Sequence, residues 1–166
     1  GDWAIPEGYE VPVLMYHNVS DSVWKEEEMF CSPEHIRDQF EYFIREGYEP
    51  IWFSDLWHIE DFEKPIILTF DDGCTDNYTE LFPILKEYNF KATFFIITKY
   101  LEHGDVHYMT TEMAREIAES GLVDLQSHTY SHTELYLLNE NYQRQEFEQS
   151  KLDLIRITGK EPYVLC

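Results

Sequence analysis

The sequence predicts an α/β fold built on a parallel sheet or barrel. Residues 65–70 and 92–98 are apolar on both faces, which is typical of strands that are buried within a parallel sheet. Patterns typical of helices separate these strands from each other and from their neighbours, as expected for a strand–helix alternation. The 166 residues fit one domain. We expect this domain over residues 11–166, after an N-terminal extension or expression remnant at residues 1–10.

Polar caps and glycines delimit the expected helices. Ser32 followed by Pro33 is typical of a helix N-cap with proline at the first helical position. Gly47 stands where a C-terminal glycine belongs. By such signals and by apolar periodicity, helices are expected from Ser32 to Gly47, over residues 79–88, from Thr110 or Thr111 to near Gly121, and from Asn139 to Gly159.

The expected strands point to three places where chemistry could lie. They cover residues 11–16, 48–53, 65–70, 92–98 and 122–126, and a further strand begins at residues 163–166. In parallel α/β folds the active site lies at the C-terminal ends of the strands. We therefore expect the functional residues just after Tyr16, Phe70 and Gln126, and unusual polar residues follow each of them.

Two adjacent carboxylates, Asp71 and Asp72, follow Phe70 and precede Gly73. Neighbouring carboxylates repel each other unless they share a cation or a proton. Because successive side chains at a strand end point in different directions, one aspartate could bind a metal while the other contacts water. An aspartate cap on a tight turn is the alternative reading of this short motif.

Two histidines four residues apart, His128 and His132, follow Gln126. They could converge on one cation if the segment turns tightly, with Thr129 bonding the backbone of the turn. With Asp72 they would supply one oxygen and two nitrogen ligands and leave positions open, as catalytic zinc sites do. The same ligands suit non-haem iron, but those enzymes usually have an antiparallel scaffold. Two unrelated surface histidines are the simplest alternative.

A single histidine, His17, follows the first expected strand. It is a candidate general acid at the same centre, although a histidine in this position more often packs in the core or caps a chain end.

Composition narrows the class of partner. The formal net charge is −21, which disfavours binding of nucleic acid or of anionic lipid. No apolar run approaches the roughly 18 residues that a membrane-spanning helix needs. The three cysteines are widely spaced and match no zinc motif or disulfide framework, so we expect isolated thiols.

At these positions the sequence resembles the polysaccharide deacetylases, carbohydrate esterase family four, whose shared unit is the NodB homology domain. Residues 69–73 match the T-F-D-D-G motif of that family, and residues 128–132 match its H-[S/T]-x-x-H motif. Between them, residues 77–79 and 82–86 resemble the family's helix and residues 91–95 its next strand. The resemblance extends from about Val11 to Cys166.

The resemblance implies a fold, a cofactor and roles for these residues. The fold would be a distorted (β/α) barrel with fewer than eight strands. Asp71 would be the general base that activates water, and Asp72, His128 and His132 would hold a divalent metal. Family members use zinc, and some work with cobalt or nickel. The reaction would remove N-acetyl groups from an N-acetylglucosamine-containing polysaccharide and release acetate.

The beginning of the chain resembles a subgroup of poly-N-acetylglucosamine deacetylases with a permuted order of motifs. In that subgroup the general-acid histidine lies near the N-terminus, so residues 12–17 imply that His17 protonates the leaving amine. The substrate would be a bacterial cell-surface or exopolysaccharide, which implies an extracellular or cell-surface location. Peptidoglycan, chitin and xylan remain open as substrates, and so does the oligomeric state.

One departure from the family leaves alternatives open. The third motif, a proline-aromatic-glycine segment, should follow a strand that is only beginning at Cys166, so we expect a C-terminally incomplete domain. The chain could therefore be a non-catalytic sugar-binding or inactive truncated domain. A hydrolase of O-acetyl esters or of non-sugar amides on the same scaffold is a further alternative. Tyr108 and Tyr130 could stack on sugar rings, although core packing is the commoner role of such side chains.

Overall fold

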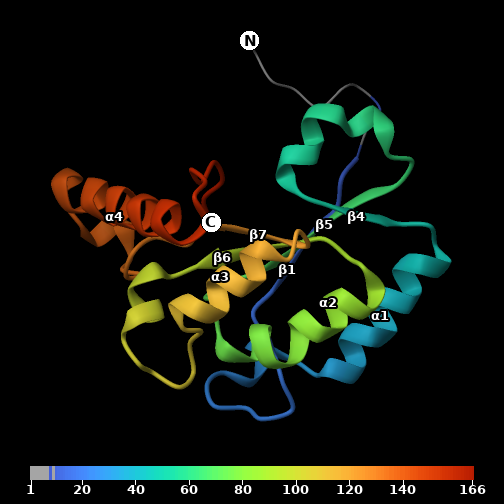
Figure 1. The fold of residues 1–166 in the computed structure, drawn as a ribbon, viewed down its shortest axis with the longest axis horizontal. Coiled ribbons are helices and arrows are strands. Elements are labelled where there is room, and N and C mark those ends of the chain that lie inside the picture. Colours follow the sequence, from blue (N-terminus) through green and yellow to red (C-terminus); the bar gives the residue numbers. More distant parts are fainter. Residues whose placement is uncertain (1–7, 9) are drawn as a thin grey trace.

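The computed structural model describes Gly8 and residues 10–166. The extension expected over residues 1–10 therefore lies outside the described residues, apart from Gly8 and Glu10. The described part is an α/β fold in which helices pack on a parallel sheet (Figure 1), as the sequence predicts.

Five parallel strands of the described chain form the main sheet, in the order β1-β5-β6-β7, with β4 beside β5. Strand β4 pairs with the first half of β5, and β6 pairs with its last two residues. A separate parallel pair, β2 and β3, lies outside this sheet. The strands are β1 Val13–Tyr16, β2 Asn18–Val19, β3 Phe30–Cys31, β4 Glu49–Ile51, β5 Pro65–Phe70, β6 Ala92–Ile96 and β7 Val123–Ser127.

Three of the four α-helices of the described chain begin at side-chain caps that the sequence predicts, namely Ser32, Thr110 and Asn139. Ser32 Oγ accepts a hydrogen bond from His35 N, and Asn139 Oδ1 accepts one from Tyr142 N. Such side chains satisfy amide groups that have no partner within the helix. Gly159 ends the last helix with a φ of 72°. The helices are α1 Pro33–Arg45, α2 Phe82–Tyr88, α3 Thr111–Glu119 and α4 Glu140–Thr158.

The main core lies between the sheet and the helices. Alternate residues of β5 (Ile66, Leu68 and Phe70) face the helices, while Ile67 faces the opposite side. This alternation is the period of a strand. All four helices contribute to the same core, with residues such as Phe40 of α1 and Leu154 of α4. In Figure 1, α1 and α2 lie side by side, and α4 extends beyond the end of β7.

A short helical segment covers the opposite side of the sheet. Residues Phe53–Asp61 form a 3-10 segment whose Leu56 and Ile59 pack with Ile51 and Ile67 in a second, smaller cluster. The sequence predicts a strand over residues 48–53, but β4 ends at Ile51 and the 3-10 segment follows it. The short periodicity of 3-10 turns leaves no clear pattern in the sequence, so they are not predicted from it.

The helix expected over residues 79–88 is irregular in its first half. Residues Asn77–Leu81 form a π-type turn, and the regular helix begins at Phe82. Pro83 has no amide hydrogen to donate to the preceding turn, which explains a widened turn at this place. The strand expected at residues 163–166 is reduced to one bridge between Leu165 and Ser127. None of the described helices combines the length and apolarity needed to cross a bilayer.

Candidate active site

The three strand ends singled out by the sequence belong to one sheet, in which β1 pairs with β5 and β6 lies between β5 and β7. His17 follows β1, Asp71 follows β5 and His128 follows β7. Asp71 N still donates to Tyr16 O at 2.9 Å, so the ladder between β1 and β5 continues into the site. His128 N donates to Ile96 O at 3.0 Å and extends the ladder between β6 and β7 in the same way. Residues far apart in sequence thus converge at one edge of the sheet.

The chain makes a strained turn after β5, and this turn begins at the second of the two aspartates. Asp72 and Gly73 have φ angles of 75° and 77°, both in the left-handed region. A Cβ atom at Gly73 would lie 2.9 Å from Ile96 Cδ1, so the turn also requires the small residue for space. Strained backbone is retained where the rest of the fold determines it, and it often marks functional sites.

The loop with the two histidines is also strained. Thr129 and His132 have φ angles of 63° and 59°, and they make up, with Asp72 and the helix-ending Asn89, the positive-φ residues other than glycine among the described residues. His132 N donates to Thr129 Oγ1 at 3.1 Å, which is the contact the sequence analysis expected of Thr129. Glu146 of α4 accepts two further hydrogen bonds from Ser131, both 2.7 Å long. The loop is therefore held rigidly.

Asp72, His128 and His132 come together as one possible set of metal ligands. One ligand atom from each of these side chains lies within 4.8 Å of the others. Asp72 Oδ1 is 3.5 Å from His128 Nε2, and the two imidazole rings are 4.8 Å apart between centroids. Asp72 is buried, and burial of a carboxylate is costly unless a cation or hydrogen bonds accompany it.

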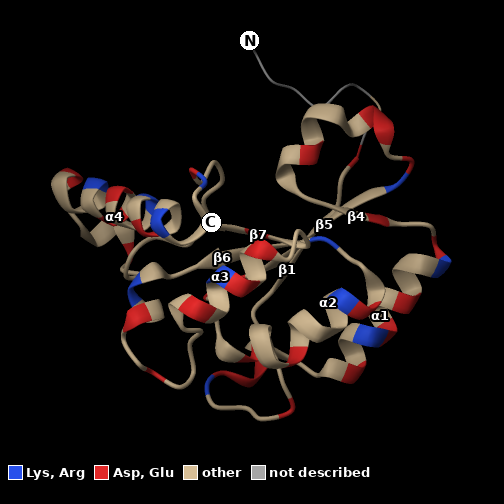
Figure 2. Cartoon of the chain, in the orientation of Figure 1, with Lys and Arg blue, Asp and Glu red and all other residues tan. Residues whose placement is uncertain are grey.

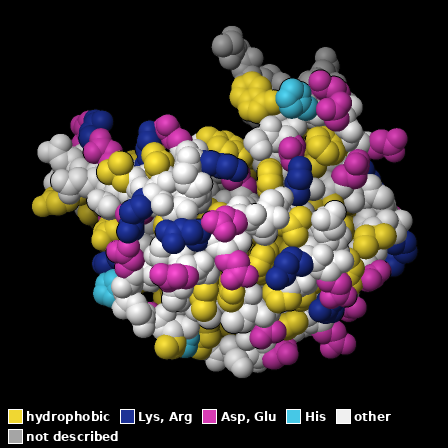
Figure 3. All heavy atoms as spheres, viewed as in Figure 1, with side chains coloured by type: hydrophobic (Ala, Val, Ile, Leu, Met, Phe, Trp, Pro, Cys, Tyr) yellow, Lys and Arg dark blue, Asp and Glu magenta, His cyan; other side chains and the backbone are white. Residues whose placement is uncertain are grey.

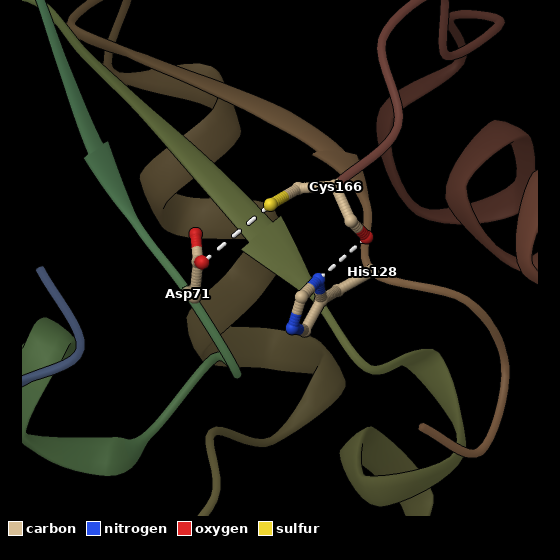
Figure 4. Close-up of side chains that lie close together, drawn as sticks. All are labelled: Asp71, His128 and Cys166. Carbon is tan, nitrogen blue, oxygen red and sulfur yellow. Dashed lines mark hydrogen bonds between the residues drawn. The ribbon is translucent and has the colours of Figure 1, made fainter. Parts of the chain in front are cut away.

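The hydrogen bonds around His128 fit the role of a metal ligand. Its Nδ1 lies 2.7 Å from the carbonyl oxygen of Cys166, as Figure 4 shows. A carbonyl can only accept, so Nδ1 carries the proton and Nε2 presents a lone pair toward Asp72. Ligating histidines commonly donate their other nitrogen to a carbonyl in this manner. The donor set of one carboxylate and two imidazoles thus fits a divalent cation such as zinc.

Asp71 has a different environment from its neighbour. It is 2% exposed, and its Oδ2 accepts a hydrogen bond from the Cys166 thiol at 3.6 Å (Figure 4). Its buried Oδ1 has no hydrogen-bond partner among the described residues. Burial raises the pKa of Asp71 to about 6; the Cys166 hydrogen bond opposes this shift and the charge of Asp72 adds to it. A buried carboxylate with one free oxygen can accept a proton from a nearby group.

Asp72 is held in the ionised form instead. Burial alone would raise its pKa, but the hydrogen bond and charge of Lys25, together with the charges of His17 and His128, outweigh burial, so that the pKa is lowered. Lys25 Nζ lies 2.7 Å from Asp72 Oδ2. The pKa of Asp71 is therefore raised and that of Asp72 lowered from the ordinary value of an aspartate. Such opposite shifts are often found in pairs of groups that have different chemical tasks.

His17 lies half-buried at the same centre. The pKa of His17 is lowered, first by burial; the charge of Asp72 works against this, while Lys25 and His132 lower it further. Its backbone carbonyl accepts a hydrogen bond from Asn77 Nδ2 at 2.8 Å, which fixes the chain just after β1. The structure thus brings all five predicted site residues, His17, Asp71, Asp72, His128 and His132, to one edge of the sheet.

Two residues near this centre were missed by the sequence analysis. Lys25 lies in an acidic segment without periodicity, and nothing local indicates that it reaches Asp72, 47 positions away. Cys166 was interpreted only as an isolated thiol. Cys166 is the last of residues 163–166, where a strand is expected, and the carboxyl end of a parallel strand there would lie near the other strand ends. The structure leaves Cys31, Cys74 and Cys166 as free thiols.

The two tyrosines suggested as sugar platforms differ in their surroundings. Tyr108 stacks on Tyr100 with 4.2 Å between ring centroids, so one of its faces is already covered. Tyr130, within the histidine loop, lines a groove of about 410 Å³ together with Tyr142 and Leu152 of α4. Of the two, Tyr130 is the better placed to meet a ligand.

Acidic side chains are distributed over the molecule. Figure 2 shows Asp and Glu on all parts of the fold, and Figure 3 shows them interspersed with Lys, Arg and apolar groups on the viewed face. The net charge of −21 is therefore a property of the whole surface rather than of one patch on that face.

Comparison with known proteins decides the family. The model of the family described as polysaccharide deacetylase matches residues 59–166, which include both aspartates and both histidines of the site. The chain belongs to the polysaccharide deacetylase family. The Bacillus subtilis protein YxkH, a polysaccharide deacetylase by name, is 33% identical over 147 residues, which are 86% of this chain and 50% of that protein. The sequence-based prediction of the family is thus confirmed.

Other relatives of this deacetylase-family chain carry more specific names. The Escherichia coli K12 poly-beta-1,6-N-acetyl-D-glucosamine N-deacetylase is 29% identical over 136 residues, covering 71% of this chain and 20% of that protein. A peptidoglycan-N-acetylglucosamine deacetylase of Bacillus cereus is 34% identical over 98 residues. The chain thus spans about half the length of the Bacillus subtilis relative and a fifth of the Escherichia coli one.

Solved structures of deacetylases share the fold. A polysaccharide deacetylase from Bacillus cereus aligns with a TM-score of 0.84 at 30% identity, over 93% of this chain and 49% of that one. A Streptococcus pyogenes deacetylase in complex with acetate aligns with a TM-score of 0.83 at 28% identity, over 93% of this chain and 72% of that one. The predicted α/β fold of the NodB-homology type is therefore confirmed.

Proposed function

We propose that this chain is the catalytic part of a metal-dependent deacetylase that removes N-acetyl groups from an N-acetylglucosamine-containing polysaccharide and releases acetate. The observation that carries the proposal is the convergence of Asp72, His128 and His132 beside Asp71, whose buried Oδ1 lacks a partner among the described residues. The names of the Escherichia coli and Bacillus cereus relatives support this choice of substrate. Residues 11–166 would form the deacetylase domain, acting outside the cell or at its surface.

The metal would be held by Asp72, His128 and His132, with zinc the first candidate and cobalt or nickel as alternatives. When bound, a divalent cation supplies polarisation of the acetyl carbonyl and makes water easier to deprotonate. His128 is already oriented for this task by the Cys166 carbonyl, and His132 by the Thr129 hydroxyl at its backbone amide.

The protein's own residues carry the proton transfers. Asp71 accepts a proton from the water whose oxygen adds to the acetyl carbon, and its raised pKa favours this role near neutral pH. The carbon–nitrogen bond then breaks. His17, in its protonated form, donates a proton to the departing nitrogen, so that acetate and a free amine leave. The polysaccharide must lie across the edge of the sheet, between the end of β1 and the histidine loop.

Acetate release from a panel of substrates tests this function. Purified protein supplied with zinc or cobalt should release acetate from N-acetylglucosamine oligomers, with little release from O-acetylated xylan or from a simple non-sugar amide. Preferential release from the ester would support the O-acetyl esterase alternative. Sugar binding without any acetate release, in a protein that has bound metal, would instead support the non-catalytic alternative.

A further inference from the structure

A lysine side chain lies on one of the proposed metal ligands. Lys25 Nζ is 2.7 Å from Asp72 Oδ2, and the two side chains are 17% and 11% exposed. Every other ion pair formed by Lys or Arg in the described chain has at least one partner that is more than 30% exposed. The Lys25–Asp72 pair is therefore the most enclosed of these ion pairs.

An aromatic cluster holds Lys25 in this position. Lys25 Nζ lies 5.3 Å from the ring centroid of Trp24, and that ring stacks on His107 at 4.1 Å. Trp24 also meets Phe30 and Tyr108 edge-on. These contacts tie the Trp24 ring, and with it the loop that carries Lys25, to His107 and Tyr108.

Residues 107–109, which include two ring partners of Trp24, are hydrogen-bonded to the turn that carries Asp72. Met109 N donates to Gly73 O at 3.0 Å, and Thr75 N donates to His107 O at 2.8 Å. Lys25 is thus fixed to the same framework as its carboxylate partner. The choice of partner is not a consequence of proximity in sequence, because Glu26, Glu27 and Glu28 are adjacent and exposed, yet Lys25 pairs with Asp72.

A divalent cation bound at this centre would lie close to the Lys25 ammonium group, because both would contact the Asp72 carboxylate. Asp72 has a single negative charge, and Lys25 already neutralises it. Like charges at such short range repel strongly in an enclosed site. We propose that Lys25 is a resident counter-ion that competes with the divalent metal for Asp72 and thereby lowers the metal affinity of the centre. The inference depends on the metal site proposed above.

The same contact has a second consequence in the metal-free protein. Without Lys25, the buried carboxylate of Asp72, next in sequence to the buried Asp71, would have only histidine as a basic neighbour among the described residues. Removing one partner of an enclosed ion pair destabilises the fold, since it leaves a charge without compensation. A metal that binds only the folded protein would restore that stability by mass action. Loss of Lys25 should therefore make folding depend more on metal.

The test compares metal binding by charge-changing variants of Lys25. Chelator-stripped protein is titrated calorimetrically with zinc and with cobalt. Lys25→Met and Lys25→Gln should bind each metal at least tenfold more tightly than the unchanged chain. Lys25→Arg keeps the positive charge and should stay within about threefold of it. Lys160→Met removes an exposed lysine distant in sequence and controls for the change in net charge.

Thermal unfolding gives a second readout that does not depend on activity. Metal-free Lys25→Met should melt below the unchanged chain, and saturating zinc should raise its melting temperature by more than it raises that of the unchanged chain. Equal or weaker metal binding by Lys25→Met and Lys25→Gln would overturn the inference while leaving the metal site intact. If neither the unchanged chain nor these variants bound metal, the proposed metal site itself would fail, and the inference with it.

Discussion

Two adjacent aspartates illustrate how environment sets chemistry at the level of single residues. Burial, with a smaller contribution from the charge of Asp72, raises the pKa of Asp71 to about 6, against the opposing effect of the hydrogen bond from the Cys166 thiol. Asp72, one residue further, has its pKa lowered, because Lys25, His17 and His128 outweigh the effect of burial. The strained turn at Asp72 and Gly73 directs the two side chains to these different surroundings. In the proposed mechanism, two consecutive residues would thus supply a proton acceptor and a metal ligand.

Replacement of the proposed base separates these two tasks. Asp71→Asn should lower kcat by about 100-fold or more, because an amide cannot accept the proton. Metal affinity should stay within about threefold, because Asp71 is not in the proposed set of ligands. Acetate release and calorimetric metal titration check the two parts.

The matched control for this variant is Asp38→Asn, at an exposed position on α1. It should retain full turnover. If Asp71→Asn kept more than a few per cent of the activity, the base would have to be another group.

At the scale of elements, the turn after β5 is the part that backbone geometry constrains most. Gly73 has a φ of 77°, and a Cβ atom there would overlap with Ile96 of the neighbouring strand β6. The turn is joined to residues 107–109 by two backbone hydrogen bonds. A change at Gly73 would therefore disturb β6 and the site together.

An alanine scan of two glycines tests this constraint. Gly73→Ala should lower the free energy of unfolding by about 3 kcal/mol, through left-handed strain and overlap together. Gly104→Ala has a similar φ of 69° but open space around the new methyl group. It should lose only about 1 kcal/mol. Urea denaturation measures both, and equal losses would show that the contact with Ile96 carries no weight.

The elements that sequence predicts are those with local signals. Ser32, Thr110 and Asn139 cap helices as predicted, since capping depends on residues only three positions apart. The convergence of the two aspartates and the two histidines was predicted because parallel strands bring their carboxyl ends together. The contact of Lys25 with Asp72 and the fold of residues 53–61 were not. They depend on packing between distant segments, and no local pattern records that packing.

At the scale of the whole molecule, the sheet assembles a site from distant parts of the chain. His17 and His132 are 115 positions apart in the numbering, yet the charge of one acts on the pKa of the other. The match to the deacetylase family begins at residue 59 and so leaves out β1, with its candidate acid, and Lys25. These two N-terminal contributions, His17 and Lys25, therefore come from the part of the chain that lies before the residues matched by the family model.

The most direct test of the metal centre is calorimetric titration of the chelator-stripped chain with zinc and cobalt, beside His128→Ala and an exposed control, His103→Ala. We predict one cation per chain. Affinity should fall at least about 100-fold in His128→Ala, because loss of an outer-sphere partner alone costs 10–100-fold, and it should be unchanged in His103→Ala. Binding that is equal in all three proteins, or absent from the unchanged chain and Lys25→Met alike, would contradict a centre built on Asp72, His128 and His132.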